Sequence, residues 1–248
     1  MLNEPTIQKL KVLKLDAMAA AWAEQQKTAD MAKLAFDERL GLLVDAECLF
    51  RENRRLGRLL KEAKLKIGQA CVEDIDYPPK RELDKAIVRQ LATCRWLHEH
   101  QNVTVTGPTG VGKTYVACAL AQHACRRGFS AMYRRASRLF DELTLARADG
   151  SYVRLLGKLA RTDVLVIDDW GLTACRDSER QDLLEILEDR YGSRSTIMTS
   201  QIPRDKWHEH LGDATVADAI LDRIIHNAHK LVLKGPSRRK GKEEVTGN

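Results

Sequence analysis

The first 66 residues follow a helical pattern of apolar and polar positions. The segment has no glycine before Gly41 and no proline after Pro5, so little in it breaks a helix. Further along, one stripe of positions recurs with alternating spacings of four and three, which is typical of a helix with one packed face. These positions are Leu42, Ala46, Leu49, Asn53, Leu56, Leu60 and Ala63. Residues 1–66 are therefore predicted to form an all-helical N-terminal domain whose stripe packs.

Five basic side chains occupy the opposite side of the same helix, within an arc of about 120°. They are Arg51, Arg54, Arg55, Arg58 and Lys61. A charged helix face is often only solvated surface. Here Glu52 and Glu62 lie outside the arc, and arginine favours bidentate contacts with phosphate. Binding of DNA phosphates is the favoured interpretation, and a solvated face remains the alternative.

Residues 67–82 interrupt the helical pattern at Tyr77-Pro78-Pro79-Lys80 and are predicted to be a linker. From 83 to 234 helical and strand-like segments alternate, which predicts an α/β domain with a parallel sheet covered by helices on both faces. The predicted helices span 83–98, 112–127, 137–148, 178–192, 203–211 and 215–228, and the predicted strands span 102–106, 130–135, 164–168, 196–200 and 230–234. Residues 235–248 are predicted to be a basic, flexible tail.

Three helix ends carry capping signals. Ser137 and Ser178 are predicted N-caps, the second with Gln181 as a capping box, and Gly128 is a predicted C-cap.

The composition of the chain indicates the compartment in which we expect the protein. Lys and Arg total 41 against 35 Asp and Glu, a net charge of +6 whose placement matters more than its size. The six cysteines form no C-x-x-C pair, which favours reduced thiols over a disulfide framework or a zinc site. No apolar stretch approaches the ~18 residues of a membrane span. Lysines at 9, 11 and 14 interrupt the region where a signal peptide would need its apolar core. We expect a cytoplasmic protein.

A phosphate-loop motif follows the apolar run 102–106. Its residues are Gly107, Pro108, Thr109, Gly110, Val111, Gly112, Lys113 and Thr114, the pattern G-x-x-x-x-G-K-[ST]. Strand, glycine-rich turn and helix in this order are the context that the motif needs, because backbone N–H groups and the helix N-terminus then converge on phosphate oxygens. Lys113 is predicted to reach the β- and γ-phosphates, and the Thr114 hydroxyl to ligate Mg²⁺.

An acidic pair ends another buried strand. The run 164–167 is fully apolar and leads into Asp168 and Asp169, at the strand end where open α/β sheets bind ligands. We predict that Asp168 holds Mg²⁺ through water and that Asp169 orients or deprotonates the attacking water. The alternative, an acidic pair that only caps the next turn, is disfavoured by the phosphate loop upstream.

Two further positions are weaker candidates on chemistry alone. Gln201 follows the strand 196–200 and could hydrogen-bond the γ-phosphate or the attacking water. Arg223 is a lone arginine on an otherwise apolar helix, which is commonly a snorkelling or salt-bridged side chain. The guanine-reading motif N-K-x-D is absent from the sequence, which favours ATP over GTP.

Taken together, these segments resemble an AAA+ ATPase of the DnaC/DnaA-like clade. The N-terminal segment Arg51-Glu52-Asn53-Arg54-Arg55-Leu56 resembles the IstB branch, the ATP-binding helper proteins of insertion-sequence transposases. The resemblance covers essentially the whole chain. It implies the AAA+ strand order, a homo-oligomer that shares ATP sites, Gln201 as first sensor, and Arg223 as an arginine finger on the ATP of the adjacent subunit.

The chain departs from the AAA+ pattern in two residue types. Asp169 stands where glutamate is commonest, which predicts slow hydrolysis, and Gln201 stands where asparagine is usual. A helical lid is not expected after Arg223, and Arg238 and Arg239 are the candidates for a second sensor.

The resemblance implies an ATP-dependent factor that assembles on duplex DNA, bends it and recruits or stimulates a transposase. DNA contacts would be made mainly to the sugar-phosphate backbone by the five residues of the N-terminal helix, with Arg134, Arg135, Arg238, Arg239 and Lys240 as additions. Three alternatives remain: a replicative helicase loader, a small-molecule phosphotransferase, and a DNA scaffold whose hydrolysis is vestigial.

Overall fold

The computed structural model describes residues 3–238. The chain forms two compact units, of which the first ends at Arg58 and the second begins at Leu59. The helical N-terminal unit is therefore shorter than the 66 residues expected. Within the described residues, no helix is both long enough and apolar enough to cross a membrane.

The first unit is built from helices, as the sequence indicates. They are α1 (Asn3–Val12), α2 (Asp16–Gln25), the 3-10 helix η1 (Ala29–Lys33) and the first part of α3 (Phe36–Ala63), which continues into the second unit. Glu47 of α3 accepts hydrogen bonds at 3.0 and 3.1 Å from the backbone N–H groups of Ala17 and Met18. This carboxylate thus caps the N-terminus of α2, where its charge also complements the helix dipole.

The expected stripe on α3 packs only in part. Leu42 is 46% exposed and Leu49 is 60% exposed, whereas Leu43 is buried one position away. Leu59 and Ala63, at the end of the helix, are buried. The prediction that the whole stripe packs is therefore wrong for its first turns, because α1 and α2 are short and the buried positions of α3 at this level are Leu43 and Glu47.

The second unit is organised around a five-stranded parallel sheet with the order β2-β3-β4-β1-β5. The strands are β1 (Asn102–Thr106), β2 (Ala131–Arg135), β3 (Val164–Trp170), β4 (Ser195–Ser200) and β5 (Ala228–Val232). All five predicted strands are confirmed, and half of their ends match the prediction while the others are shifted by one or two residues. The strand order puts the carboxyl ends of β1, β4 and β3 side by side, which is where the candidate residues stand.

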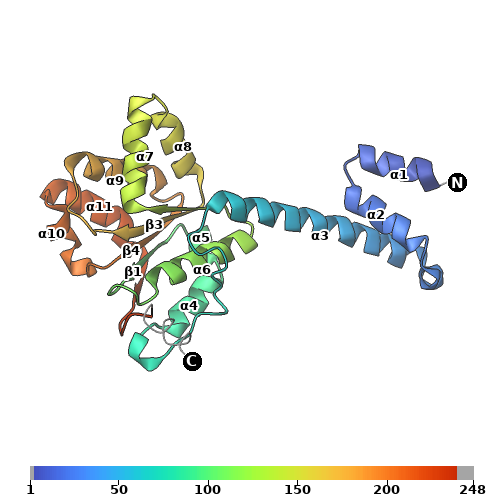
Figure 1. The fold of residues 1–248 in the computed structure, drawn as a ribbon, viewed down its shortest axis with the longest axis horizontal. Coiled ribbons are helices and arrows are strands. Elements are labelled where there is room, and N and C mark those ends of the chain that lie inside the picture. Colours follow the sequence, from blue (N-terminus) through green and yellow to red (C-terminus); the bar gives the residue numbers. More distant parts are fainter. Residues whose placement is uncertain (1–2, 239–248) are drawn as a thin grey trace, which may run out of the picture. The chain divides into compact units, whose positions relative to one another are not determined.

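Helices cover both faces of this sheet (Figure 1), as predicted. In chain order they are α4 (Lys85–Ala92), α5 (Arg95–His98), α6 (Lys113–Arg126), α7 (Ala136–Ala148), α8 (Tyr152–Arg161), α9 (Asp177–Arg190), α10 (Trp207–Leu211) and α11 (Ala214–Ile225), with 3-10 helices η2 (Pro79–Arg81) and η3 (Arg204–Lys206). Helix α6 packs against four strands, and α7 to α11 pack against the other face.

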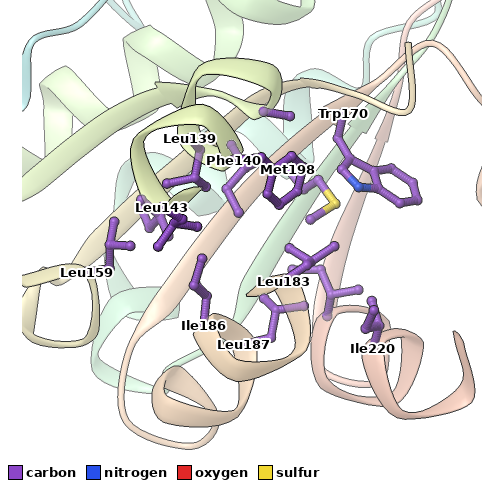
Figure 2. Packing of buried hydrophobic residues seen from close by; sticks show 14 of the residues in the cluster. Leu139, Phe140, Leu143, Leu159, Trp170, Leu183, Ile186, Leu187, Met198 and Ile220 are labelled. Atoms are coloured by element: carbon purple, nitrogen blue, oxygen red, sulfur yellow. The ribbon is translucent and has the colours of Figure 1, made fainter. Parts of the chain in front are cut away.

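The larger part of the core lies between the sheet and α7 to α11. Figure 2 shows Leu139 of α7 and Leu183 and Ile186 of α9 meeting Met198 of β4. Alternate residues of β3 face opposite sides, so that Leu165 and Ile167 enter this cluster. Burial on both faces explains why the strands read as nearly continuous apolar runs.

Several local predictions need correction. The predicted helix 83–98 is broken at Cys94, whose φ of 59° is left-handed, and α8 was not predicted. Helix α9 begins at Asp177 after the N-cap residue Arg176, so Ser178 is not its cap. Helix α7 begins at Ala136, before Ser137.

The C-cap at Gly128 is confirmed. Its φ is 87°, and its N–H donates to the carbonyl of Cys125, while the next N–H donates to Ala124. Residues 67–82, expected to be a linker, belong instead to the second unit, where Ala70 and Ile75 are buried.

Candidate functional site

The phosphate-loop motif connects β1 to α6, as its strand–turn–helix context predicts. Gly112 is the N-cap residue of α6 with a φ of 95°, a conformation that costs glycine little. A Cβ atom at Gly112 would lie 2.7 Å from Nη2 of Arg81. At Gly107 it would lie 2.1 Å from the carbonyl oxygen of Leu233. Both positions therefore require glycine.

Lys113 points back into the loop. Its ammonium donates hydrogen bonds to the carbonyl oxygens of Gly107 at 2.7 Å and Pro108 at 2.8 Å, and its side chain is buried. The positive charge is thus held at the centre of the curved backbone, beside the N-terminus of α6. This arrangement concentrates positive potential where phosphate oxygens would bind.

Asp168 is a fully buried carboxylate surrounded by hydroxyl groups. It accepts hydrogen bonds from Thr114 at 3.0 and 3.1 Å, from Thr199 at 2.6 Å and from Tyr133 at 2.6 Å. Because the Thr114 hydroxyl donates its proton to Asp168, its lone pairs remain available to a metal. Hydroxyl and carboxylate oxygens are hard donors that suit Mg²⁺, so this pair fits that ion.

Asp169 turns away from the strand. Its φ of 58° is left-handed, and its N–H donates to the Thr199 hydroxyl at 2.9 Å. One carboxylate oxygen lies 3.3 Å from Nε of Arg135. A non-glycine residue held in this region costs about 1–3 kcal/mol and is common where a side chain must be aimed at a site.

One pocket of about 760 Å³ brings the predicted residues together. The phosphate loop forms one wall through Lys113 and Thr114, and Asp169 and Gln201 line it from β3 and β4. The Gln201 amide oxygen accepts a hydrogen bond from the Thr109 hydroxyl at 2.7 Å. Residues widely separated in sequence are therefore close in space, and the size suits a nucleotide.

The same pocket includes Arg238 and Lys66. The N–H of Arg238 donates to the carbonyl of Gly110 at 3.0 Å, and its guanidinium pairs with both carboxylate oxygens of Asp76. Of the two candidates for a second sensor, Arg238 thus lies at the pocket, and Arg239 lies outside the described residues, as does Lys240. Lys66 was not singled out from the sequence.

Arg223 lies at the opposite end of the sheet. Its backbone carbonyl accepts a hydrogen bond from Asn102, the first residue of β1, at 2.9 Å. The phosphate loop follows the other end of that strand, four steps of roughly 3.3 Å away. The Arg223 guanidinium pairs with Glu188, lies 3.5 Å from Asp222 and lies over the Tyr191 ring. It is not part of the pocket that its own chain forms.

The predicted DNA-binding residues divide into two groups. All five basic residues of α3 have exposed side chains. Among them, Arg51 donates to Glu47 at 2.8 Å and to the carbonyl of Lys14. Arg134 is mostly buried and donates to Glu142 at 2.9 Å, while Arg135 pairs with Asp169. The two arginines of β2 are therefore engaged within the second unit.

Other metal chemistry is not indicated among the described residues, where no group of three His, Cys, Asp or Glu side chains could hold an ion. All six cysteines are free thiols. Burial raises the pKa of Cys118 and Cys125 to about 11, so both are protonated at neutral pH.

The fold is shared with solved structures of replication proteins. The DnaC helicase loader superposes with a TM-score of 0.55 at 24% identity, covering 66% of this chain and 97% of that one. DnaI gives a TM-score of 0.58 at 23% identity over 71% of this chain and 93% of that one. DnaA bound to AMPPCP and single-stranded DNA gives 0.55 at 15% identity, covering 71% and 54%. At these identities the likeness shows the fold, a P-loop ATPase fold of the AAA+ type.

Sequence similarity is closer to proteins of insertion sequences. A protein of Sinorhizobium fredii, whose name describes it as an insertion sequence ATP-binding protein, is 48% identical over 240 residues, which cover 97% of this chain and 98% of that protein. A protein of Pseudomonas fluorescens named for insertion sequence IS1162 is 50% identical over 82% of this chain and 88% of that protein. The model of the family "IstB-like ATP binding protein" matches residues 8–245. The chain therefore belongs to the IstB-like family of ATP-binding proteins.

Proposed function

We propose that the protein is an oligomeric ATPase that assembles on duplex DNA in its ATP-bound form and recruits or stimulates a transposase. The observation that carries this proposal is the distance, within one chain, between the nucleotide pocket and Arg223. The pocket of a chain holds Lys113, Asp169 and Gln201, whereas Arg223 lies at the far end of the sheet. Arg223 can therefore act on a nucleotide only in the pocket of a second copy.

Within the pocket, each side chain has a distinct task. Lys113 binds the β- and γ-phosphates, and the Thr114 hydroxyl, oriented by Asp168, faces the metal. Mg²⁺ bound beside Thr114 and Asp168 would supply positive charge that offsets the negative charge of the phosphates. Asp169 orients or deprotonates the attacking water, and Gln201, held by Thr109, faces the terminal phosphate. Because aspartate is one methylene shorter than glutamate, we expect slow turnover.

Arg223 would act on the ATP of the neighbouring subunit. In the isolated chain its charge is satisfied by Glu188, so assembly must exchange that carboxylate for a phosphate. A finger that stabilises charge in the transition state contributes about 10³–10⁵ in rate in related phosphoryl transfers. ATP at a subunit junction therefore both strengthens assembly and is hydrolysed there, which makes hydrolysis a means of disassembly.

DNA would be bound through the exposed cations of α3 rather than through Arg134 and Arg135. The α3 set presents five exposed cations along one helix, of which Arg51 also pairs with Glu47. In the β2 pair, Arg134 is mostly buried and Arg135 pairs with Asp169. Contacts of this kind fix position without reading bases. We expect weak sequence preference and an affinity that falls with salt, with a log–log slope of about −0.9 for each phosphate neutralised.

A transposase is the partner that membership of an insertion-sequence family favours. A helicase loader shares the fold, and a pull-down with each purified partner separates the two functions. A small-molecule phosphotransferase leaves the cationic helix without a role, and phosphate transfer to a nucleoside without stimulation by DNA would support it. A scaffold with vestigial hydrolysis would show nucleotide-dependent DNA binding without turnover.

Duplex binding and complex size, measured with ADP, ATP and a non-hydrolysable analogue, test the proposal. We expect large complexes on DNA with ATP and the analogue, and dispersal with ADP. Lys113→Ala should remove the nucleotide dependence. A DNA affinity that does not change with salt would contradict the role given to α3.

A further inference from the structure

Lys66 brings a second lysine to the nucleotide pocket from outside the phosphate loop. It lies three residues beyond the end of α3 at Ala63, at the last position of the N-terminal domain that the sequence predicts as helical. Its ammonium is 3.8 Å from a carboxylate oxygen of Asp168. It lines the same pocket as Lys113, Thr114 and Asp169.

The backbone around Lys66 is fixed beside that pocket. Ala63 and Ala70 are fully buried on either side, and Ile67, which also lines the pocket, accepts a hydrogen bond from the N–H of Ala70 at 3.1 Å. The side chain is different, because it is 45% exposed. A long side chain on a fixed base can move its charge within the pocket without a rearrangement of the chain.

The contact with Asp168 is a weak one. At 3.8 Å the ammonium and the carboxylate form an ion pair but no hydrogen bond. The carboxylate itself is fully buried and takes its hydrogen bonds from Thr114, Thr199 and Tyr133. Lys66 therefore contributes charge to a buried anion rather than geometry, and solvent screens part of that contribution.

We propose that Lys66 binds the terminal phosphate of ATP and distinguishes ATP from ADP. The inference rests on the proposed ATP-binding function of this pocket. With a divalent cation beside Asp168, the Lys66 ammonium gains less from that carboxylate. Of the other anions at the pocket, Asp169 is paired with Arg135, and the triphosphate carries the highest charge. Lys66 thus neutralises Asp168 in the free protein and the γ-phosphate in the loaded one, while Lys113 stays within the loop.

The test is equilibrium binding of fluorescent, non-hydrolysable ATP and of fluorescent ADP to the full chain carrying Lys66→Met. With excess Mg²⁺, we expect the affinity for the triphosphate to fall about tenfold, as for loss of one charge-assisted hydrogen bond. The affinity for the diphosphate should change less than twofold. In EDTA the substitution should lower the affinity for the triphosphate less, because without a cation the Lys66 ammonium stays paired with Asp168.

Two variants make the test specific. Lys64→Met removes a neighbouring charge that does not line the pocket and should leave both affinities unchanged. Lys66→Arg keeps the charge and should retain most of the preference for the triphosphate. Thermal melts of each variant establish that it is folded before the affinities are compared.

The outcomes separate this inference from the function on which it rests. Wild-type protein that binds neither nucleotide would remove both. Wild-type protein that prefers the triphosphate, with the same preference in Lys66→Met, would overturn only the role of Lys66. An equal loss of affinity for ATP and ADP in Lys66→Met would also overturn it, since Lys66 would then bind the diphosphate part that both nucleotides share.

Discussion

Nε of Arg135 lies 3.3 Å from a carboxylate oxygen of Asp169, so that the last residue of β2 holds the proposed water-activating acid of β3. The Asp169 side chain is 18% exposed and that of Arg135 is 47% exposed. An acid that is paired with a guanidinium is oriented toward that partner rather than toward a water molecule. We infer that the ion pair holds Asp169 in a less active arrangement, and that turnover requires the contact between Arg135 and Asp169 to open.

Replacing Arg135 with methionine should release Asp169. We expect Arg135→Met to hydrolyse ATP several-fold faster than wild type, both in the absence of DNA and in its presence. Steady-state phosphate release with and without duplex measures both effects. Arg138→Met, which removes an exposed charge outside the nucleotide pocket, is the matched control. Slower DNA-free turnover in Arg135→Met would contradict the restraint.

The trans role of Arg223 predicts a loss of hydrolysis without a loss of binding. Arg223→Ala should bind ATP as wild type does, because its side chain is remote from the pocket of its own chain. Turnover in the assembled state should fall by about 10³-fold. Mixing Arg223→Ala with Asp169→Asn subunits should restore part of the activity at the junctions that combine intact halves. Unchanged turnover in Arg223→Ala alone would exclude the finger.

The ion pair with Glu188 should limit how readily Arg223 can reach the ATP of a neighbouring subunit. In the isolated chain Glu188 pairs with Arg223 and has its pKa lowered by that hydrogen bond. An exposed ion pair of this kind is weak, because solvent screens it. Glu188→Gln should therefore lower the protein concentration for half-maximal ATPase activity by a few-fold. The maximal rate at saturating protein should stay the same, and a higher required concentration would refute the competition.

Arg190 should be important for stability rather than for chemistry. Its guanidinium is buried and donates to the backbone carbonyls of Leu159, Thr162 and Ser195 and to the hydroxyl of Thr196. Arg190→Met would leave these buried acceptors without donors, at a cost of about 3 kcal/mol or more. Urea unfolding of the variant and of wild type measures the difference. A loss below about 0.5 kcal/mol would show that water or neighbouring groups satisfy the carbonyls.

The sheet and the nucleotide pocket could be predicted because each depends on a local pattern. Fully apolar runs identify buried parallel strands. The glycine spacing of residues 107–114 identifies the tight turn of a phosphate loop. Asp168 and Asp169 were found because they end one of those strands. The order of the strands in the sheet, β3-β4-β1, then brings them to the side of the phosphate loop.

The missed features depend on contacts between distant segments. Helix α8 was overlooked because Gly150 and Gly157 obscure its pattern, although Leu156 and Leu159 are buried. Lys66 lies in a segment without a motif. Basic residues such as Arg135 look alike in sequence, whether they face solvent or pair with an acid 34 positions later.

The caps of α7 and α9 show the limit of short signals. A serine near a helix start predicts a cap, but the helices begin one residue earlier than expected. For α9 the reason is that Glu179 bonds back to the N–H of Arg176.

The most direct test of the central claim is light scattering of the protein mixed with a short duplex. The measurement is made with ADP, with a non-hydrolysable ATP analogue and without nucleotide. The account predicts one defined multi-subunit complex on DNA with the analogue, and smaller species under the other two conditions. A protein that stays monomeric and does not bind the duplex under any of the three conditions would contradict the claim.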